Sequence, residues 1–376
     1  MKRKNKVYLI SVFGAVVTSA VLFFSFANNY KLVSWHLKNQ IASIQNVMLP
    51  EKDELGNVLY KGAISHIFFH SLIVYPKLAF DGGPNNQVYK DYMITRDDFQ
   101  KILPELYKNN YILIDIKSLY DVGNDGSVER KVLYLPVNKK PLVISLDDQS
   151  YYSSMKGHGF ADKLVLDKNG NVSTQIITPE GITQVTRDGD VVPILDDFVS
   201  AHPNFSFKGA KGVIAVTGFE GILGYRTDYD DISKYPLDLA FAKVVINKLK
   251  ATGWRFASHS YTHSKAFSTD SITLENLKND TEQWDREVKS LVGDTDIFVG
   301  PFGDIFKSSD PRRAYLVSKG FKMFCGVGMD SYLHYFPDNV AMDRANIDGF
   351  RITHSPKLLK KYFDTAVIVD GDIKYQ

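Results

Sequence analysis

His259 and His263 stand four positions apart. This spacing can put both imidazoles on one face of a helical turn, close enough to hold a single metal ion. A metal site needs at least one further ligand, and the doublet Asp147-Asp148 offers two carboxylates directly after the apolar run 141–146, where a buried strand would end. Two neighbouring carboxylates can divide the work, one binding the metal and the other accepting a proton from the water bound to it. Together these residues indicate a zinc hydrolase.

The spacing of the histidine pair is a weak signal when taken alone, because it recurs at His66 and His70. The segment 64–70 around that second pair reads as the first strand of a barrel. On a strand, residues four apart share a face but lie about 13 Å apart, too far to chelate one ion. We therefore interpret His66 and His70 as packing residues or as residues that line a site.

The order of further motifs along the chain is more specific. The Asp147-Asp148 doublet is followed by the histidine pair, then by segment 300–304 (Gly-Pro-Phe-Gly-Asp) after the apolar run 297–299, and then by a late His354. In this order the motifs resemble those of the polysaccharide deacetylases, the NodB-homology proteins of carbohydrate esterase family 4. The resemblance covers roughly residue 60 to the C-terminus.

The resemblance implies a role for each motif. It implies that Asp147 is the general base, that the backbone N–H of Phe302 helps to bind the oxyanion, and that His354 is the general acid. It also implies a divalent metal ion held by three protein ligands, which are Asp148, His259 and His263.

The match departs from the family pattern at one position. Val299 stands where many members carry an arginine whose charge orients the catalytic aspartate. Another residue must then supply that charge, and both Arg344 and Arg226 are candidates. Arg344 is the one we include in the catalytic set.

The chemistry of this residue set fits the hydrolysis of an N-acetyl group. A divalent metal lowers the pKa of a bound water towards about 7, and a protonated histidine can donate to a leaving sugar nitrogen, which is too basic to depart unaided. The products would be acetate and a free amino sugar. Zinc is the default for two histidines and one aspartate with an open coordination position, although cobalt or nickel could use the same ligands.

The N-terminus carries a second signal. Four cationic residues within positions 1–6 precede the run 7–27, which contains no charged residue and is long enough to span a bilayer. Cationic residues on its N-terminal side predict that this end stays in the cytoplasm. We expect an uncleaved single-pass anchor with an extracellular catalytic domain. The alternative is a signal peptide cleaved near Ala27, which would release a secreted protein.

The predicted organisation has three parts: a cytoplasmic tip and anchor over 1–27, a juxtamembrane stalk over 28–59, and a catalytic domain over 60–376. Helical periodicity over 97–110, with Thr95 as N-cap, alternates with strand-like runs, which indicates an α/β domain with parallel strands. The family resemblance implies a distorted (β/α) barrel of seven strands. Turn signals that flank 171–186 predict a β-hairpin insertion, and the aromatic, glycine-rich loop 219–225 lies further along.

Composition limits the other functions that need to be considered. Cys325 is the only cysteine, so no internal disulfide is possible, and we interpret it as a buried thiol. The formal net charge of +2 becomes −2 without the four cationic residues at the N-terminus, which gives no support to a nucleic-acid partner. The predicted partners are an N-acetylated glycan, such as peptidoglycan or an exopolysaccharide, and the membrane. Two alternatives stay open: a catalytically impaired glycan-binding protein of the same fold, and a glycoside hydrolase that needs no metal.

Overall fold

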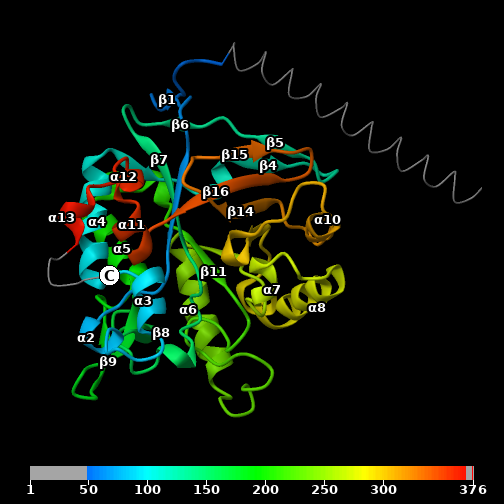
Figure 1. Cartoon of the computed structure of the whole chain (residues 1–376). Helices are drawn as coiled ribbons and strands as arrows, with labels where there is room; N and C mark the ends of the chain where they lie inside the picture. Colours follow the sequence, from blue (N-terminus) through cyan, green and yellow to red (C-terminus); the bar gives the residue numbers. More distant parts are fainter. Residues whose placement is uncertain (1–48, 370–374, 376) are drawn as a thin grey trace, which may run out of the picture. The chain divides into compact units, whose positions relative to one another are not determined.

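The computed structural model describes residues 49–369 and 375. The chain divides into two units, Met1–Leu55 and Gly56–Gln376, and the second unit contains every strand and helix of the described residues (Figure 1). The predicted anchor at 1–27 and the stalk as far as residue 48 lie outside the described residues. Within the described residues, no helix combines the length and apolar character that a membrane span requires.

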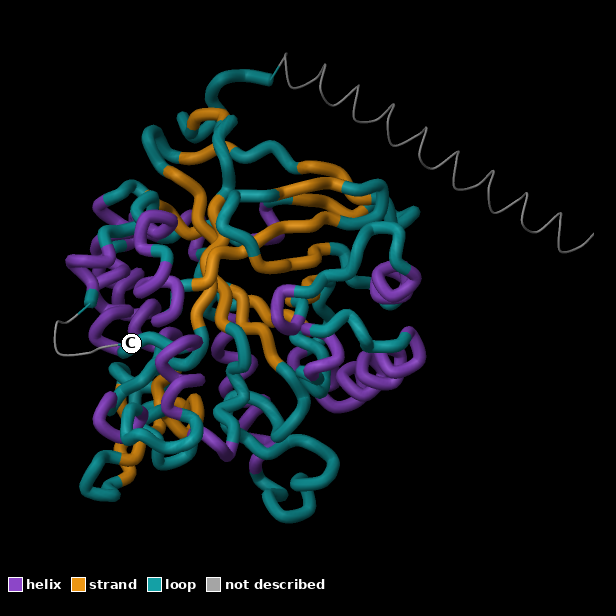
Figure 2. The backbone as a smooth tube through the Cα atoms, in the orientation of Figure 1, coloured by secondary structure: helices purple, strands orange, loops and turns teal. Residues whose placement is uncertain are grey.

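Seven parallel strands form a closed barrel at the centre of the second unit (Figure 2). The barrel closes because β7 pairs with β2 on one side and with β11 on the other. An eighth parallel strand, β3 (Tyr111–Leu113), pairs with the first half of β7 and distorts the barrel there. The predicted seven-stranded (β/α) barrel is confirmed. In spatial order, its strands are β2 (Ser65–Phe69), β7 (Lys140–Leu146), β11 (Val213–Val216), β12 (Arg255–Ser258), β13 (Ile297–Val299), β14 (Met323–Val327) and β16 (Val340–Asn346).

The helices follow the strands along the chain and surround the barrel (Figure 2). The predicted helix over 97–110 is confirmed as α4, where the Thr95 hydroxyl accepts a hydrogen bond from the Asp98 N–H as the predicted N-cap. The helices are α2 (Pro76–Ala79), α3 (Asn86–Tyr92), α4 (Arg96–Lys108), α5 (Val191–Ala201), α6 (Asp238–Ala251), α7 (Lys265–Ser268), α8 (Leu274–Trp284), η5 (Asp285–Lys289), α9 (Ser290–Val292), α10 (Pro311–Ser318), α11 (Gly349–His354), α12 (Pro356–Leu359) and α13 (Thr365–Ile368).

The insertion after β7 has three strands, where the sequence predicted a two-stranded hairpin. They are β8 (Ala161–Leu166), β9 (Val172–Ile177) and β10 (Thr183–Thr186), and they form an antiparallel sheet of their own. The predicted turn at 167–170 joins β8 to β9, whereas a second turn ending at Gly181, which the prediction overlooked, adds β10. The remaining short strands are β1 (Val58–Leu59), β4 (Tyr120–Val122), β5 (Val128–Arg130), β6 (Tyr134–Leu135) and β15 (Leu333–Tyr335).

Side-chain alternation along the barrel strands decides which residues face the interior. Along β7, Leu142, Ile144 and Leu146 pack in the large cluster that includes the helices, whereas Val143 belongs to a second cluster. That second cluster takes alternate residues from the other barrel strands, among them Ala257 and Cys325. These alternate residues fill the barrel interior, and Cys325 is fully buried, as predicted. The same alternation continues past the strand ends and carries polar residues onto the interior face at one end of the barrel.

Asp190 connects two of the loops at that end. It caps the N-terminus of α5 through the Val191 N–H, and its carboxylate also accepts hydrogen bonds from the Leu72 N–H and the Tyr151 hydroxyl. These partners follow β2 and β7 respectively. Burial raises the pKa of Asp190 to about 6, although the hydrogen bonds from Tyr151 and the backbone act in the opposite direction.

We predict that Asp190 makes the protein less stable as the pH rises from about 4 to about 6. In that window the folded protein keeps a proton that the unfolded chain, with the ordinary pKa of 3.8, has lost. The free energy of unfolding therefore falls by up to about 3 kcal/mol across the window. Asp190→Asn, which keeps a capping side chain, should remove this contribution. Urea unfolding at pH 4, 5, 6 and 7 gives the free energy of unfolding of both proteins. If that free energy changes with pH by the same amount in both, the prediction is contradicted.

Candidate active site

Three potential metal ligands converge at the end of the barrel. One ligand atom from each of Asp148, His259 and His263 lies within 4.8 Å of the other two. The Nε2 atom of His263 is 3.9 Å from the Asp148 carboxylate, and the centroids of the two imidazole rings are 4.8 Å apart. A carboxylate and two imidazoles on one face are a ligand set that zinc accepts, so the residues present fit a divalent metal.

The histidine pair does not lie on a helical turn, as its spacing had suggested. His259 directly follows β12, and His263 lies in an irregular loop in which Ser260 and His263 have φ angles of 59° and 46°. The left-handed Ser260 turns the chain back, and its hydroxyl accepts a hydrogen bond from the His263 N–H. Asp280 of α8 then fixes the loop by accepting bonds from the N–H groups of Tyr261 and Thr262. A strand end followed by a tight loop therefore brings the two rings together.

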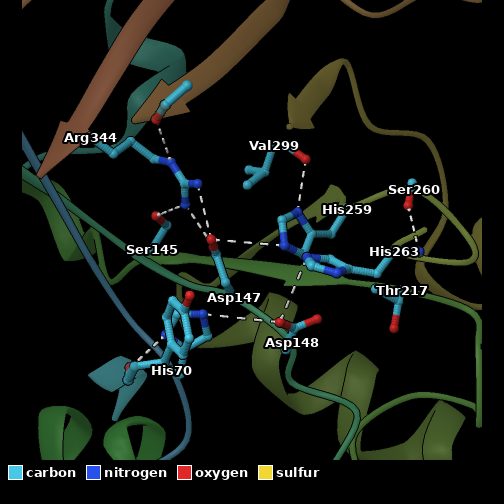
Figure 3. A network of polar contacts seen from close by, with 12 residues as sticks. His70, Ser145, Asp147, Asp148, Thr217, His259, Ser260, His263, Val299 and Arg344 are labelled. Atoms are coloured by element: carbon cyan, nitrogen blue, oxygen red, sulfur yellow. Dashed lines mark hydrogen bonds and ion pairs between the residues drawn. The ribbon is translucent and has the colours of Figure 1, made fainter. Parts of the chain in front are cut away.

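Asp148 is held in place by its neighbours. Its φ angle of 56° is in the left-handed region, which non-glycine residues seldom adopt and which is often found at functional sites. The Tyr152 hydroxyl lies 2.7 Å from Oδ1 of Asp148 and 2.8 Å from the Thr217 hydroxyl. The other carboxylate oxygen, Oδ2, faces His263 (Figure 3). Hydrogen bonding on one oxygen thus orients the other towards the metal position.

Asp147 forms a buried ion pair with Arg344. The guanidinium donates to both carboxylate oxygens, at 2.6 and 2.9 Å, and neither residue is more than 4% exposed (Figure 3). Arg344 also donates to the Ser145 hydroxyl and the Gly326 carbonyl, and it lies over the Phe68 ring at 4.2 Å. Four of its five N–H donors therefore have acceptors, and each of its three nitrogens donates, as a buried charge requires.

The sequence left Arg344 and Arg226 as alternatives for the arginine beside Asp147, and of these two the structure places only Arg344 against Asp147. Arg226 instead donates to the carbonyls of Glu220 and Tyr151. Burial alone would raise the pKa of Asp147, but the charges of Arg344 and then His259 outweigh burial and hold that pKa below its ordinary value of 3.8. Asp147 is therefore ionised at neutral pH and able to accept a proton.

His259 is oriented by the residue that replaces the family arginine. Its Nδ1 lies 2.8 Å from the Val299 carbonyl oxygen. A carbonyl oxygen only accepts, so Nδ1 carries the proton and Nε2 is the unprotonated nitrogen that a metal ion binds. Burial is the largest influence on the pKa of His259 and lowers it below 6.5, against the neighbouring carboxylates, which favours the neutral ring. The Nε2 atom is 3.9 Å from Asp147.

His70 lies beside the metal cluster. Its Nε2 is 4.0 Å from the Asp148 carboxylate, and Figure 3 shows it across that carboxylate from His263. Its Nδ1 lies 2.9 Å from the Tyr92 carbonyl, which assigns the proton to Nδ1 by the same reasoning as for His259. His66, four residues earlier on the same strand face, lies deeper and contacts the Ser145 hydroxyl. The sequence interpreted His66 and His70 together as packing or site-lining residues and could not say which of them reaches the site. The signal was its alternation with His66 and Phe68, which contact the interior residues Ser145 and Arg344.

His354 is not brought to this cluster. It ends α11 with its side chain exposed, its Nδ1 3.0 Å from the Phe350 carbonyl and its ring stacked on the Phe350 ring at 4.3 Å. Within the described residues it forms no hydrogen bond or ion pair with Asp147, Asp148 or either metal-binding histidine. The role of general acid that the family resemblance assigned to His354 therefore has no support from its position.

Phe302 lies at the edge of the site. Its φ angle is 56°, its side chain is half exposed, and its ring packs against that of His263 at 4.4 Å. In the part of the chain that the structure describes, the Phe302 N–H donates to no acceptor. A free backbone N–H next to a metal ligand can bind the oxyanion of a tetrahedral intermediate.

No protein-family model matches the chain, and no curated protein matches it. Its fold is similar to that of solved deacetylases. The deacetylase PplD from Streptococcus pyogenes, in complex with acetate, shares 14% sequence identity at a TM-score of 0.45, with 81% of this chain and 99% of that chain covered. BC0361, a polysaccharide deacetylase from Bacillus cereus, shares 15% at 0.42, covering 82% and 69%. A de-N-acetylase from Aggregatibacter actinomycetemcomitans shares 12% at 0.42, covering 80% and 100%. The chemistry open to this chain follows from its own residues.

We predict that Arg344→Met destabilises the protein by about 3–5 kcal/mol, because it leaves the buried Asp147 charge without a partner. Arg255→Met is the matched control: Arg255 also contacts both oxygens of an aspartate, Asp115, but its side chain is 50% exposed. An exposed pair is worth about 0–1 kcal/mol. Urea unfolding at neutral pH compares the two variants, and equal losses would refute the special role of the buried pair.

Proposed function

We propose that this protein is a metal-dependent deacetylase that removes N-acetyl groups from the amino sugars of a glycan. The observation that carries the proposal is the pair of adjacent aspartates with separate partners. Asp148 faces two histidines in a metal-binding arrangement, whereas Asp147 is held as a carboxylate by Arg344. One carboxylate for a metal and one for a proton is what the hydrolysis of an amide with water requires.

The metal would be held by Asp148, His259 and His263, and we propose zinc, with cobalt or nickel as substitutes that use the same ligands. When bound, it supplies Lewis acidity for the substrate carbonyl and for the attacking water. The protein contributes the remaining parts. The Tyr152 hydroxyl orients Asp148, and the Val299 carbonyl orients His259.

The protein residues account for each proton in the reaction. Asp147 accepts a proton from water as the water oxygen bonds to the carbonyl carbon. The Phe302 N–H donates to the oxygen that becomes negative. As the carbon–nitrogen bond breaks, the amine nitrogen takes a proton. We assign its donor to His70 in its doubly protonated, imidazolium form: Nδ1–H stays on the Tyr92 carbonyl, and Nε2, which faces the site, gives up its proton and leaves the neutral ring. The products are acetate and an amino sugar.

The two alternatives now have less to support them. A binding protein without activity was plausible because Val299 replaces the family arginine, but Arg344 supplies a guanidinium to Asp147 from another strand. A glycoside hydrolase needs two carboxylates on either side of the scissile bond. Here the two carboxylates are adjacent in sequence, and the histidines converge on one of them.

For the setting of the reaction, we propose a single-pass membrane protein with its catalytic domain outside the cell and peptidoglycan or an exopolysaccharide as substrate. The uncharged run 7–27 and the cationic residues before it support this proposal. Cleavage near Ala27 would instead give a secreted enzyme with the same active site.

We predict that the full-length protein binds one zinc ion and that Asp148→Ala or His263→Ala abolishes stoichiometric binding. Tyr152→Phe should weaken zinc affinity by about 10- to 100-fold, because it releases one oxygen of Asp148. His334→Ala, at an exposed histidine outside the cluster, is the control. Metal content by mass spectrometry and competition with a chromophoric chelator measure both effects. Full zinc occupancy in both ligand variants would exclude this site.

We predict that the zinc-loaded protein releases acetate from N-acetylglucosamine oligomers or from purified peptidoglycan, and that a chelator stops the reaction. Asp147→Asn should abolish the release because it removes the general base. Release that persists with chelator, or in Asp147→Asn, would contradict the mechanism.

The same assay tests the proton donor. His70→Asn should lower kcat by about 10²- to 10⁴-fold, the usual contribution of a general acid. His354→Asn should keep its activity, because among the described residues the hydrogen bond and the ring contact of His354 are both with Phe350 of its own helix. Activity that is lost in His354→Asn and kept in His70→Asn would instead identify His354 as the general acid.

A further inference from the structure

Three lysines lie at the end of the barrel opposite the active site. Lys140 is the first residue of β7, Lys139 precedes it, and Lys361 follows α12. A strand advances about 3.3 Å per residue, so the start of β7 lies about 23 Å from Asp147, which follows its end. The Tyr111 hydroxyl donates to the Lys361 carbonyl at 3.1 Å, and Tyr111 pairs with Lys140 in the sheet. Segments far apart in the sequence therefore bring these lysines together.

Each of the three lysines lies over an aromatic ring. The Nζ atoms of Lys139, Lys140 and Lys361 are 5.0, 4.3 and 5.0 Å from the centroids of three tyrosine rings, those of Tyr107, Tyr111 and Tyr362 respectively. The rings of Tyr111 and Tyr362 are themselves 5.7 Å apart. The aromatic rings thus hold the three ammonium groups on one region of the surface, which we call the basal patch.

The lysines of the basal patch form no ion pair within residues 49–369. The Lys361 ammonium donates to the Met329 carbonyl at 2.9 Å. Burial lowers the pKa of all three lysines, and a carboxylate, that of Asp330, acts against burial only at Lys361. A bound anion would supply the countercharge that the described residues leave out.

The chain enters the second unit at the same end of the barrel. β1 pairs with β6, and β6 ends four residues before Lys139 (Figure 1). The turn between β6 and β7 also carries Val137, whose side chain is 58% exposed. Only about thirty residues separate the proposed membrane span at 7–27 from β1. The end of the barrel to which the proposed anchor is attached is therefore the end that carries the basal patch.

Anionic phospholipid headgroups match the chemistry of this surface. A lysine near an anionic membrane increases the binding constant about five-fold, so three lysines together contribute about a hundredfold. An exposed valine beside cationic side chains suits the boundary between headgroups and acyl chains. Attachment through the anchor makes the docking intramolecular, so a weak attraction is sufficient. A soluble polyanion gains no such advantage.

We propose that the basal patch binds the anionic headgroups of the membrane that anchors the chain, so that the active site opens away from the bilayer. The proposal rests on the membrane setting proposed above and makes it more specific. The active site then faces glycan that stands at least about 23 Å from the headgroups.

The test measures the reactivity of individual lysines in the full-length protein inserted into nanodiscs. Discs of phosphatidylcholine alone are compared with discs in which about a third of the lipid is phosphatidylglycerol. Acetylation by an amine-reactive ester is followed for each lysine by mass spectrometry. The three lysines of the basal patch should react about 3- to 10-fold more slowly in the anionic discs, and salt at about 0.5 M should remove the difference by screening the charges. Lys168, on the turn between β8 and β9, and Lys243, on α6, are exposed and should react equally in both.

A triple variant tests the patch independently. It combines Lys139→Gln, Lys140→Gln and Lys361→Gln, and the exposed neighbour Lys360 serves as the reporter. Lys360 should be protected by anionic discs in the unaltered protein and should lose that protection in the triple variant. The matched control combines Lys168→Gln, Lys234→Gln and Lys243→Gln, and it should keep the protection. Thermal unfolding identifies a variant that fails to fold, in which case the labelling of the unaltered protein decides.

Equal reactivity of the basal patch in both kinds of disc, or protection of Lys168 and Lys243 instead, would overturn the proposal. The same holds if inorganic phosphate protects the patch equally well in phosphatidylcholine discs, because the ligand would then be a soluble phosphate. A chain that does not insert into discs would refute the membrane setting alone. Sedimentation with vesicles of the same two compositions then tests the patch, and binding that depends neither on phosphatidylglycerol nor on the three lysines would overturn it.

Discussion

The Arg344–Asp147 ion pair is the interaction on which the geometry of the site depends. A buried charge is costly unless a partner satisfies it, and here each residue satisfies the other through two hydrogen bonds in the barrel interior. The pair joins β16 to the end of β7, two strands that are not neighbours because β2 lies between them. Asp147 cannot rotate without leaving the guanidinium unpaired. Its sequence neighbour Asp148 therefore starts from a fixed backbone position and turns directly towards the histidines.

The polar end of the barrel is supported by an apolar interior. Alternate strand residues such as Val143, Ala257 and Cys325 fill the space below the site. The site is therefore accessible from the loops at the carboxyl ends of the strands, the end at which barrels of parallel strands and helices carry their active sites. The loops carry the strained backbone, with left-handed φ angles at Asp148, His263 and Phe302. Rigid strands thus position the carboxylate base, and tight turns position the groups around it.

Local sequence patterns predicted what depends on local structure. Apolar runs, capping residues and motif order predicted the strand that ends just before Asp147, the helix capped by Thr95 and the grouping of Asp148 with the two histidines. The choice between Arg344 and Arg226 could not be made from the sequence, because it depends on which strands meet across the barrel. The same holds for His70, which reaches Asp148 only because β2 and β7 are neighbours. β10 was overlooked because three of its four residues are exposed and give no apolar alternation.

The ion pair between Asp147, at the end of β7, and Arg344, on β16, also determines when the site is completed during synthesis. All three proposed metal ligands have been added to the chain once residue 263 is made, but the guanidinium that pairs with Asp147 follows about eighty residues later. Until then β16 is missing, the barrel is open between β14 and β2, and the Asp147 carboxylate has no counter-ion. The last strand to be added therefore both closes the barrel and supplies the partner of the Asp147 carboxylate. An unfinished or C-terminally truncated chain could hold a metal ion without being able to use it.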